Sequence, residues 1–175
     1  NGNIYAILAD FLPNSSNYAS DAGLNLVTNK SYGVNSTVNR ADLLTKLTTN
    51  SNWSGLTNGI TGAIATGAPT EELILNSYRT EAGKELTNNT FDNSIDNYSL
   101  YVSQTGDYNG THNYWLATEA SGSTTDLRGI RYSGEIRQDS YNNEYMGLRP
   151  VVMLPSNINV VKNGEKVYSK KKIKV

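Results

Sequence analysis

The sequence predicts an α+β fold in which two helices pack on small antiparallel sheets beside a long irregular loop region. Apolar residues recur at three- and four-residue spacing in two segments of the first half of the chain, which is the pattern of amphipathic helices. After Leu86 they alternate with polar residues and are separated by turn residues, which is the pattern of strands. Because helices and strands do not alternate along the chain, the strands are expected to form antiparallel sheets.

A short helix and a loop are expected before residue 37. The helical pattern at the start of the chain consists of Ile4, Leu8, Phe11 and Leu12. Pro13 ends this pattern, because proline lacks the N–H that a continuing helix needs. The residues that follow are rich in Asn, Ser and Gly, which predicts a loop up to residue 36 with one short strand at 24–27.

The two amphipathic helices come next. Asn39 precedes the first helix, at 40–48, and its short side chain is suited to accept a hydrogen bond from the first turn. A Gly-rich connection is expected at 58–68. The second helix is predicted at 70–82, because acidic residues in its first turn complement the helix dipole and Gly83 can adopt the left-handed conformation that ends helices.

The second half of the chain is predicted to consist of strands and turns. The expected elements are an alternating strand at 98–102, the apolar strand YWLAT at 114–118, a hairpin of 128–132 and 135–137 around Ser133-Gly134, a buried strand at 150–154, and a hairpin of 157–161 and 166–168 around Asn163-Gly164. We expect residues 1–161 to form one domain, to which 162–175 add a C-terminal hairpin strand and a basic tail.

The composition excludes several functions. Only 18% of the residues are charged and the net charge is -1, so no basic field is available to attract nucleic acid. The chain has no cysteine, which removes disulfides, thiolate catalysis and cysteine-bound zinc, and favours a bacterial or phage protein. It also lacks an apolar run of about 20 residues, so we expect no direct membrane insertion.

The sequence offers no combination of residues for catalysis or metal binding. The only histidine, His112, lies in a predicted turn. The paired acids at 71–72 match the preference for negative charge at a helix N-terminus. Those in the run FDNSIDN at 91–97 match ordinary loop polarity, and this run lacks the glycine turn and the distal Glu of a calcium-binding loop. We therefore expect no enzyme activity, no metal and no cofactor.

Four blocks of the sequence carry a resemblance to a known group of proteins. They are RADLLTKLTTNSNW at 40–53, GAPTEELILNSY at 67–78, YWLAT at 114–118 and GLRPVVML at 147–154. In this order they resemble Firmicutes surface and prophage proteins of C-type lectin-like fold, over nearly the whole chain. That group is similar to the variable proteins of diversity-generating retroelements and, more distantly, to the formylglycine-generating enzyme fold.

The resemblance implies a rigid framework that holds an exposed variable segment. Trp115 would be buried or half buried in a framework strand, and Pro150 fits the closing strand only at a strand start or edge. Arg149 is expected to make a structural ion pair, because a guanidinium beside an apolar run needs a carboxylate partner. The enzyme activity does not carry over, since it requires cysteines, and the Glu-Pro-Asn, Gln-Pro-Asp and Trp-Asn-Asp triplets of calcium-dependent sugar binding are absent.

Residues 128–145 lie between two framework strands and have the composition of an antibody-like recognition surface. Tyr supplies rigid contact area, Asn and Ser supply adaptable hydrogen bonds, and Arg supplies charge. The ligand-binding candidates are Arg128, Tyr132, Arg137, Tyr141, Asn142, Asn143 and Tyr145. Asn, Tyr, Ser and Asp are also reached by randomising adenines in Asn codons, which agrees with the retroelement resemblance. The plainer interpretation is a polar hairpin and loop in a chain rich in Tyr and Asn.

These observations predict a ligand-binding or adhesion module that is extracellular or on the cell surface of a bacterium or phage. An extracellular or cell-surface protein is favoured as the partner over carbohydrate, because the sugar-chelating triplets are absent. The alternative is the globular head of a pilin-like or fibre subunit. In that case the stripe at 4–12 would end a longer amphipathic helix, and the chain would assemble into a surface fibre.

Overall fold

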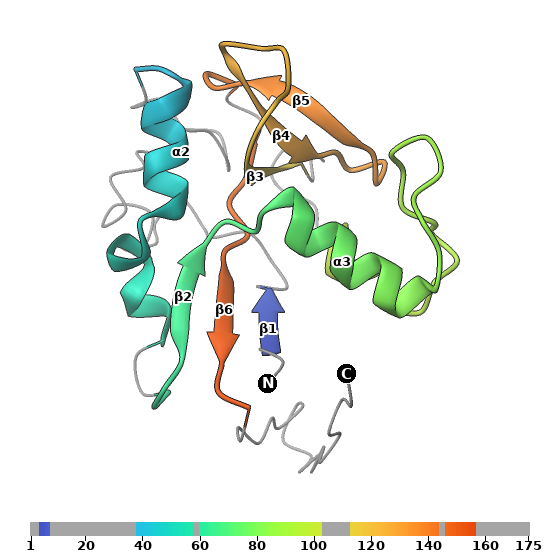
Figure 1. Ribbon diagram of the computed structural model, residues 1–175, viewed down its shortest axis with the longest axis horizontal. Coiled ribbons are helices and arrows are strands. Elements are labelled where there is room, and N and C mark those ends of the chain that lie inside the picture. The colour runs from blue at the N-terminus through green and yellow to red at the C-terminus, as the bar shows by residue number, and fades with distance from the viewer. Residues whose placement is uncertain (1–3, 8–37, 58–59, 103–112, 144–145, 157–175) are drawn as a thin grey trace.

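The computed structural model describes residues 4–7, 38–57, 60–102, 113–143 and 146–156, and within them it has the predicted α+β architecture (Figure 1). One three-stranded antiparallel sheet has the strand order β1-β6-β2, and the other has the order β3-β4-β5. The strands are β1 (Ile4–Ile7), β2 (Ile64–Gly67), β3 (Tyr114–Glu119), β4 (Asp126–Ile130), β5 (Ile136–Ser140) and β6 (Val151–Leu154). The helices are α2 (Arg40–Thr48), α3 (Glu71–Ala82) and the short α4 (Tyr98–Tyr101), with a 3-10 helix, η1 (Asn50–Thr57), after α2.

The helices α2 and α3 lie where the sequence predicts them, because both have strong end signals. Asn39 caps α2 by accepting a hydrogen bond from the N–H of Asp42 at 2.9 Å. Thr70 caps α3 in the same way, with the N–H of Leu73 at 3.1 Å. Gly83 ends α3 in the left-handed conformation, at φ 65°. The local sequence therefore determines where each of these helices begins and ends.

The predicted apolar strands and the predicted hairpin are also found. The run at 114–118 lies in β3, and Pro150 stands directly before β6. The hairpin is formed by β4 and β5, whose register pairs Arg128 with Gln138. The strand expected at 24–27, the hairpin at 157–168 and the tail at 162–175 lie outside the described residues.

The helix predicted at the start of the chain is wrong for its described part, because residues 4–7 form β1. β1 pairs antiparallel with β6, so that Ile4 lies opposite Leu154 and Ile7 lies opposite Val151. An isolated short helix is marginal in water, whereas pairing with β6 satisfies backbone hydrogen-bonding groups on one side of residues 4–7. Tertiary pairing therefore outweighs the helical spacing of a few apolar residues.

The Gly-rich connection predicted at 58–68 is wrong at 64–67, where β2 pairs with the other side of β6. Small residues are needed there because the end of β2 lies close to the end of α2. Ala68 donates its N–H to the carbonyl of Leu47 at 3.0 Å, and a Cβ on Gly67 would overlap that same oxygen. The glycine that suggested a loop therefore permits close packing.

The strand predicted at 98–102 is instead the short helix α4. Val102 donates its N–H to the carbonyl of Tyr98 at 3.0 Å, which closes a helical turn. Tyr101 is buried and stacks on Phe91, with the ring centroids 4.9 Å apart. Aromatic packing of this kind fixes the conformation, and the alternation of residue types along the chain does not reveal it.

Two hydrophobic clusters lie on opposite sides of β3. One cluster contains Leu43, Leu47, Trp53, Ala65, Ala68, Trp115, Ala117, Leu127, Met146 and Leu148. The other contains Ile74, Tyr78, Phe91, Tyr101, Val102, Tyr114, Leu116, Ile130 and Ile136. Successive side chains of a strand point to opposite faces, so β3 contributes alternate residues to the two clusters. The strand β3 thus joins both halves of the core, as does β4 through Leu127 and Ile130.

Gly67→Ala is expected to lower the free energy of unfolding by about 3 kcal/mol or more, because the new Cβ would overlap the Leu47 carbonyl and alanine is strained at φ 83°. Gly83→Ala is the matched control. Gly83 also has a positive φ, but a Cβ there would meet nothing within 4 Å, so the loss should be about 1 kcal/mol. Urea unfolding measures both, and equal losses would contradict the close packing of β2 on α2.

Candidate functional site

The turn of the β4–β5 hairpin places an aromatic side chain at its tip. Arg131 donates its N–H to the carbonyl of Glu135 at 2.9 Å, and Gly134 donates to the carbonyl of Arg131 at 2.8 Å. Gly134 has φ 81°, as expected for a three-residue hairpin loop that ends in a left-handed residue. Tyr132 and Ser133 are the two other residues of this loop, and both are exposed.

The tip of the hairpin is attached to other parts of the chain. Phe91 donates its N–H to the carbonyl of Gly134 at 3.0 Å, and Ile136 donates to that of Asn89 at 2.8 Å. The buried side chain of Asn113 accepts a hydrogen bond from the N–H of Tyr132 at 2.9 Å. The Tyr132 side chain is nevertheless 63% exposed. The structure therefore presents an exposed aromatic ring on a fixed backbone.

Arg128, a predicted ligand-binding residue, has a framework contact instead. Its Nε and Nη2 donate to the two carboxylate oxygens of Glu71 at 3.0 and 3.1 Å, which ties β4 to the first turn of α3. In the β4–β5 register Arg137 lies opposite Gly129, the residue after Arg128, so the two arginines point to opposite faces of the sheet. The structure does not bring them together in one surface.

Arg137 and Asn142 are exposed, as a binding surface requires. The nearest opposite charge to Arg137 is Glu135, with Nε to Oε1 at 3.7 Å, which is a weak surface pair. Asn142 lies in the turn that follows β5. Together with Tyr132 at the tip, these residues are spread over the length of the hairpin.

The other predicted ligand-binding residues are partly buried or outside the described part of the chain. Tyr141 packs against the cluster that contains Trp115. Asn143 donates from Nδ2 to Oδ1 of Asp139 at 2.9 Å. Tyr145 lies outside the described residues. Tyr141 and Asn143 therefore stabilise the hairpin through contacts with the core and with Asp139.

A buried carboxylate lies beneath the hairpin, and sequence reasoning did not identify it. Asp139 is 5% exposed, and its Oδ1 accepts a hydrogen bond from Arg131 Nη2 at 2.5 Å. Among the described residues, no hydrogen-bond partner is found for its Oδ2, for Nε of Arg131 or for Nε1 of Trp115. Burial raises the pKa of Asp139, although the Arg131 charge acts in the opposite direction.

The three predicted framework residues are all buried. Trp115 lies in the core between α2 and the β3–β4–β5 sheet, and Pro150 precedes β6. Arg149 is fully buried, with its guanidinium 5.0 Å from the Tyr114 ring centroid and its Nη2 3.3 Å from the carbonyl oxygen of Ser99. The carboxylate partner expected for Arg149 stays a prediction.

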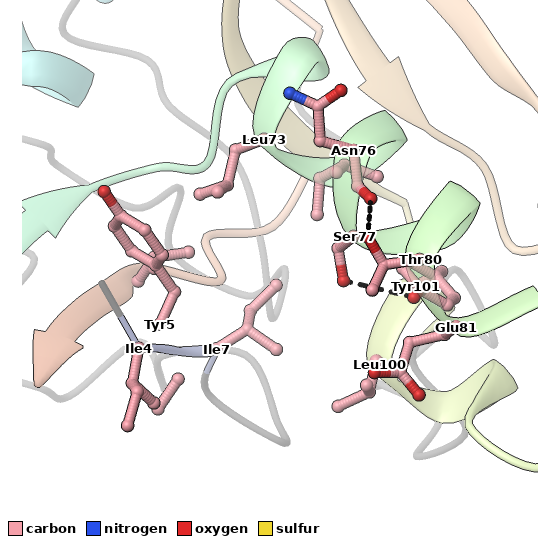
Figure 2. A pocket seen from close by; sticks show the side chains of 13 residues that line it. Ile4, Tyr5, Ile7, Leu73, Asn76, Ser77, Thr80, Glu81, Leu100 and Tyr101 are labelled. Atoms are coloured by element: carbon pink, nitrogen blue, oxygen red, sulfur yellow. Dashed lines mark hydrogen bonds between the residues drawn. The ribbon is translucent and has the colours of Figure 1, made fainter. Parts of the chain in front are cut away.

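A groove of about 620 Å³ lies between β1 and α3 (Figure 2). One wall consists of the whole of β1, and the other consists of one side of α3 together with Leu100 and Tyr101 of α4. Ser77 and Tyr101 are joined by a hydrogen bond of 3.2 Å between their hydroxyl groups. The volume falls within the range of small-ligand sites, about 300 to 1,000 Å³. No sequence pattern pointed to this groove, because half of it depends on the unpredicted strand β1.

Two of the acidic residues considered from the sequence, Glu71 and Asp92, have structural partners. Glu71 pairs with Arg128, and Asp92 accepts hydrogen bonds from Lys84 and from Ser94. The bond from Lys84 holds the pKa of Asp92 well below its usual range. Within the described residues, no three His, Asp or Glu side chains are grouped in a way that could hold a metal ion. His112 lies outside the described residues.

Comparison of the chain with protein-family models, with curated proteins and with solved structures finds no match. None of the helices in the described part of the chain is long and apolar enough to cross a membrane.

A double-mutant cycle of Arg128→Ala and Glu71→Ala is expected to give a coupling energy of about 1 to 2 kcal/mol. The coupling should be this large because the ion pair is bidentate and the two side chains are only 20% and 22% exposed. The Arg79–Glu85 pair is the matched control, 45% and 70% exposed, with an expected coupling of about 0.5 kcal/mol or less. Urea unfolding gives both energies. Equal coupling would show that the first pair does not attach the hairpin to α3.

Asp139→Asn is expected to change how stability depends on pH. The pKa of Asp139 is raised in the folded state. The stability that this carboxyl group contributes is therefore fully present below the unfolded carboxyl pKa of about 3.9, and it is lost as the pH rises through the folded-state pKa. Unfolding free energies measured from pH 4 to 7 should therefore fall more with rising pH in the parent protein than in the variant. Asp96→Asn, at an exposed position, controls for the loss of one negative charge. Parallel curves for the parent and Asp139→Asn would contradict the assigned burial.

Proposed function

We propose that the chain is an extracellular ligand-binding module of C-type lectin-like fold that presents the β4–β5 hairpin to its partner. The observation that carries the proposal is Tyr132, whose ring is exposed while the backbone of its turn is hydrogen-bonded to Asn113 and to the segment at 89–91. Exposed Tyr residues are frequent centres of binding energy in interfaces. A fixed backbone also reduces the entropy that is lost on association.

The proposed surface is narrower than the segment 128–145. It comprises Tyr132, Ser133, Arg137 and Asn142, which are exposed. Arg128 and Tyr141 are left out, because the first is paired with Glu71 and the second packs against the core. In the retroelement interpretation, only the exposed positions could vary without disturbing the framework.

A protein partner outside the cell or on a cell surface is favoured over carbohydrate. The surface combines one large aromatic ring with an arginine and small polar side chains, the mixture that protein interfaces use. The described residues offer no cluster of metal ligands that could chelate a sugar through calcium. The C-type lectin-like assignment is supported by β3 and β6, two buried framework strands with the hairpin between them in the chain.

The structure does not contain, at residues 4–7, the helix that suggested the pilin-like or fibre-subunit alternative. That alternative required residues 4–12 to continue an amphipathic helix. Residues 4–7 instead pair with β6 as a strand. We therefore propose ligand binding rather than fibre assembly as the role of this chain.

The proposal is tested by screening the protein on a biosensor against panels of extracellular proteins and glycans, followed by variants of the hairpin. Tyr132→Ala is expected to weaken binding to each ligand found by about 30-fold or more, since a central interface residue contributes about 2 kcal/mol. Arg137→Ala should weaken it less. Circular dichroism establishes that each variant remains folded.

Ile64→Ala is the matched control, because Ile64 is an exposed apolar residue on β2, in the other sheet, and does not line the groove. It should leave binding to these ligands unchanged. If Tyr132→Ala and Arg137→Ala both bind as the parent does while they remain folded, the hairpin is not the recognition surface. If the screen yields glycans alone, the preference for a protein partner is wrong.

A further inference from the structure

The groove between β1 and α3 runs along the edge of a sheet. All four residues of β1 line it, although successive side chains of a strand point to opposite faces. Val151 of β6, which pairs with Ile7, also lines the groove, so the groove borders both the edge of β1 and the sheet face that Ile7 and Val151 share. Within the described residues, β1 pairs with β6 alone and forms the end of the strand order β1-β6-β2. The backbone groups of every second β1 residue therefore point away from β6.

The opposite wall of the groove matches β1 in length. It consists of Leu73, Asn76, Ser77, Thr80 and Glu81, whose spacing places them on one side of α3. The first and last of these residues are eight positions apart, which corresponds to about 12 Å along a helix. The first and last residues of β1 are three positions apart, which corresponds to about 10 Å along a strand. The outer edge of β1 could therefore pair with about four residues of extended chain.

The lining favours apolar side chains with a positive charge at one end. Ile7, Leu73 and Val151 give the groove an apolar interior. Glu81 is exposed and lies at the end of the α3 wall, where it accepts a hydrogen bond from Asn97 at 3.0 Å. Figure 2 shows Ile7 of β1 pointing toward α3 across the groove, whereas Ile4 points away from the helix. An acyl chain could fill the apolar interior but could not pair with the free backbone groups of β1.

We propose that this groove binds an extended peptide segment of a partner protein, which adds a strand to the edge of β1. Its backbone pairs with the outward N–H and C=O groups of β1, its apolar side chains at every second position enter the groove, and a Lys or Arg pairs with Glu81. This site is separate from the hairpin surface, and nothing in the proposal depends on the function proposed for that surface.

The test begins with a phage-displayed random heptapeptide library selected on the immobilised full chain. Peptides with alternating apolar residues and one basic residue should be enriched. Each enriched peptide is then synthesised with a fluorescent label, and its affinity for the protein is measured by anisotropy. Enrichment of no peptide would overturn the proposal. This is the result expected if another segment of this chain fills the groove.

Variants of α3 locate the site of binding. Thr80→Trp fills the groove from an exposed helix position, and Glu81→Lys reverses the charge at its end; each should weaken peptide binding about tenfold or more. Glu72→Lys is the matched control, since Glu72 is exposed on the same helix but does not line the groove. Tyr132→Ala should also have no effect. Equal binding by Thr80→Trp and the parent would overturn the proposal.

N-methylated peptides test whether the ligand binds as a strand. Two versions of an enriched peptide are made, with methyl groups on the backbone nitrogens of the odd or of the even residues. Because neighbouring residues of a strand direct their N–H groups to opposite sides, one version should lose about tenfold or more in affinity and the other should bind much as before. Unchanged binding of both versions, or equal loss in both, would show that the peptide does not pair with β1.

Discussion

The burial of β3 on both faces is the constraint on which the rest of the structure depends. Residues 114–117 are all buried, with Tyr114 and Leu116 in one cluster and Trp115 and Ala117 in the other. A strand covered on both sides needs two separate layers, and these contain α2 on one side and α3 on the other. The hydroxyl group of Tyr114 is therefore far from water, and it donates a hydrogen bond to the carbonyl of Tyr101 at 2.6 Å. Burial also raises the pKa of Tyr114.

Backbone hydrogen bonds from β3 position the segments that carry the two candidate sites. Ala117 donates its N–H to the carbonyl of Pro69 at 2.8 Å, next to the cap of α3. The hydroxyl of Thr118 accepts the N–H of Glu71 at 2.9 Å, and Glu71 in turn pairs with Arg128 of β4. The start of α3 is thus attached to β3 and to the neighbouring strand. One wall of the groove and the base of the hairpin are placed by the same contacts.

The part of the fold that follows from local signals could be predicted from the sequence. Asn39 and Gly83 mark helix ends by their own chemistry, and YWLAT is too apolar to lie at the surface. The strands β1 and β2 could not be predicted, because each has four residues and depends on a distant partner, β6. The same is true of α4, where the stacking of Tyr101 on Phe91 decides the conformation.

The candidate site was predicted less well, because a polar hairpin does not reveal which of its faces is covered. Ile136 and Asp139 stand three positions apart in β5, so they point to opposite faces, yet both are buried. The hairpin is thus covered on both sides over part of its length, by α3 and α4 on one face and by Met146 on the other. Tyr132 is exposed because it belongs to the turn beyond this covered part.

The helix α3 contacts both candidate sites but gives no obvious route for coupling between them. Glu71 at its N-terminus holds Arg128, while Ser77 and Thr80 line the groove further along. Between these points Ile74 and Tyr78 are buried in the core, and Tyr78 meets Phe91 edge-on with ring centroids 5.2 Å apart. A ligand in the groove could affect the hairpin only by shifting the helix as a unit, and close-packed interiors resist such shifts. The geometry therefore favours independence of the two candidate sites, one built from side chains on a fixed turn and the other from the edge of β1 that no described strand pairs with.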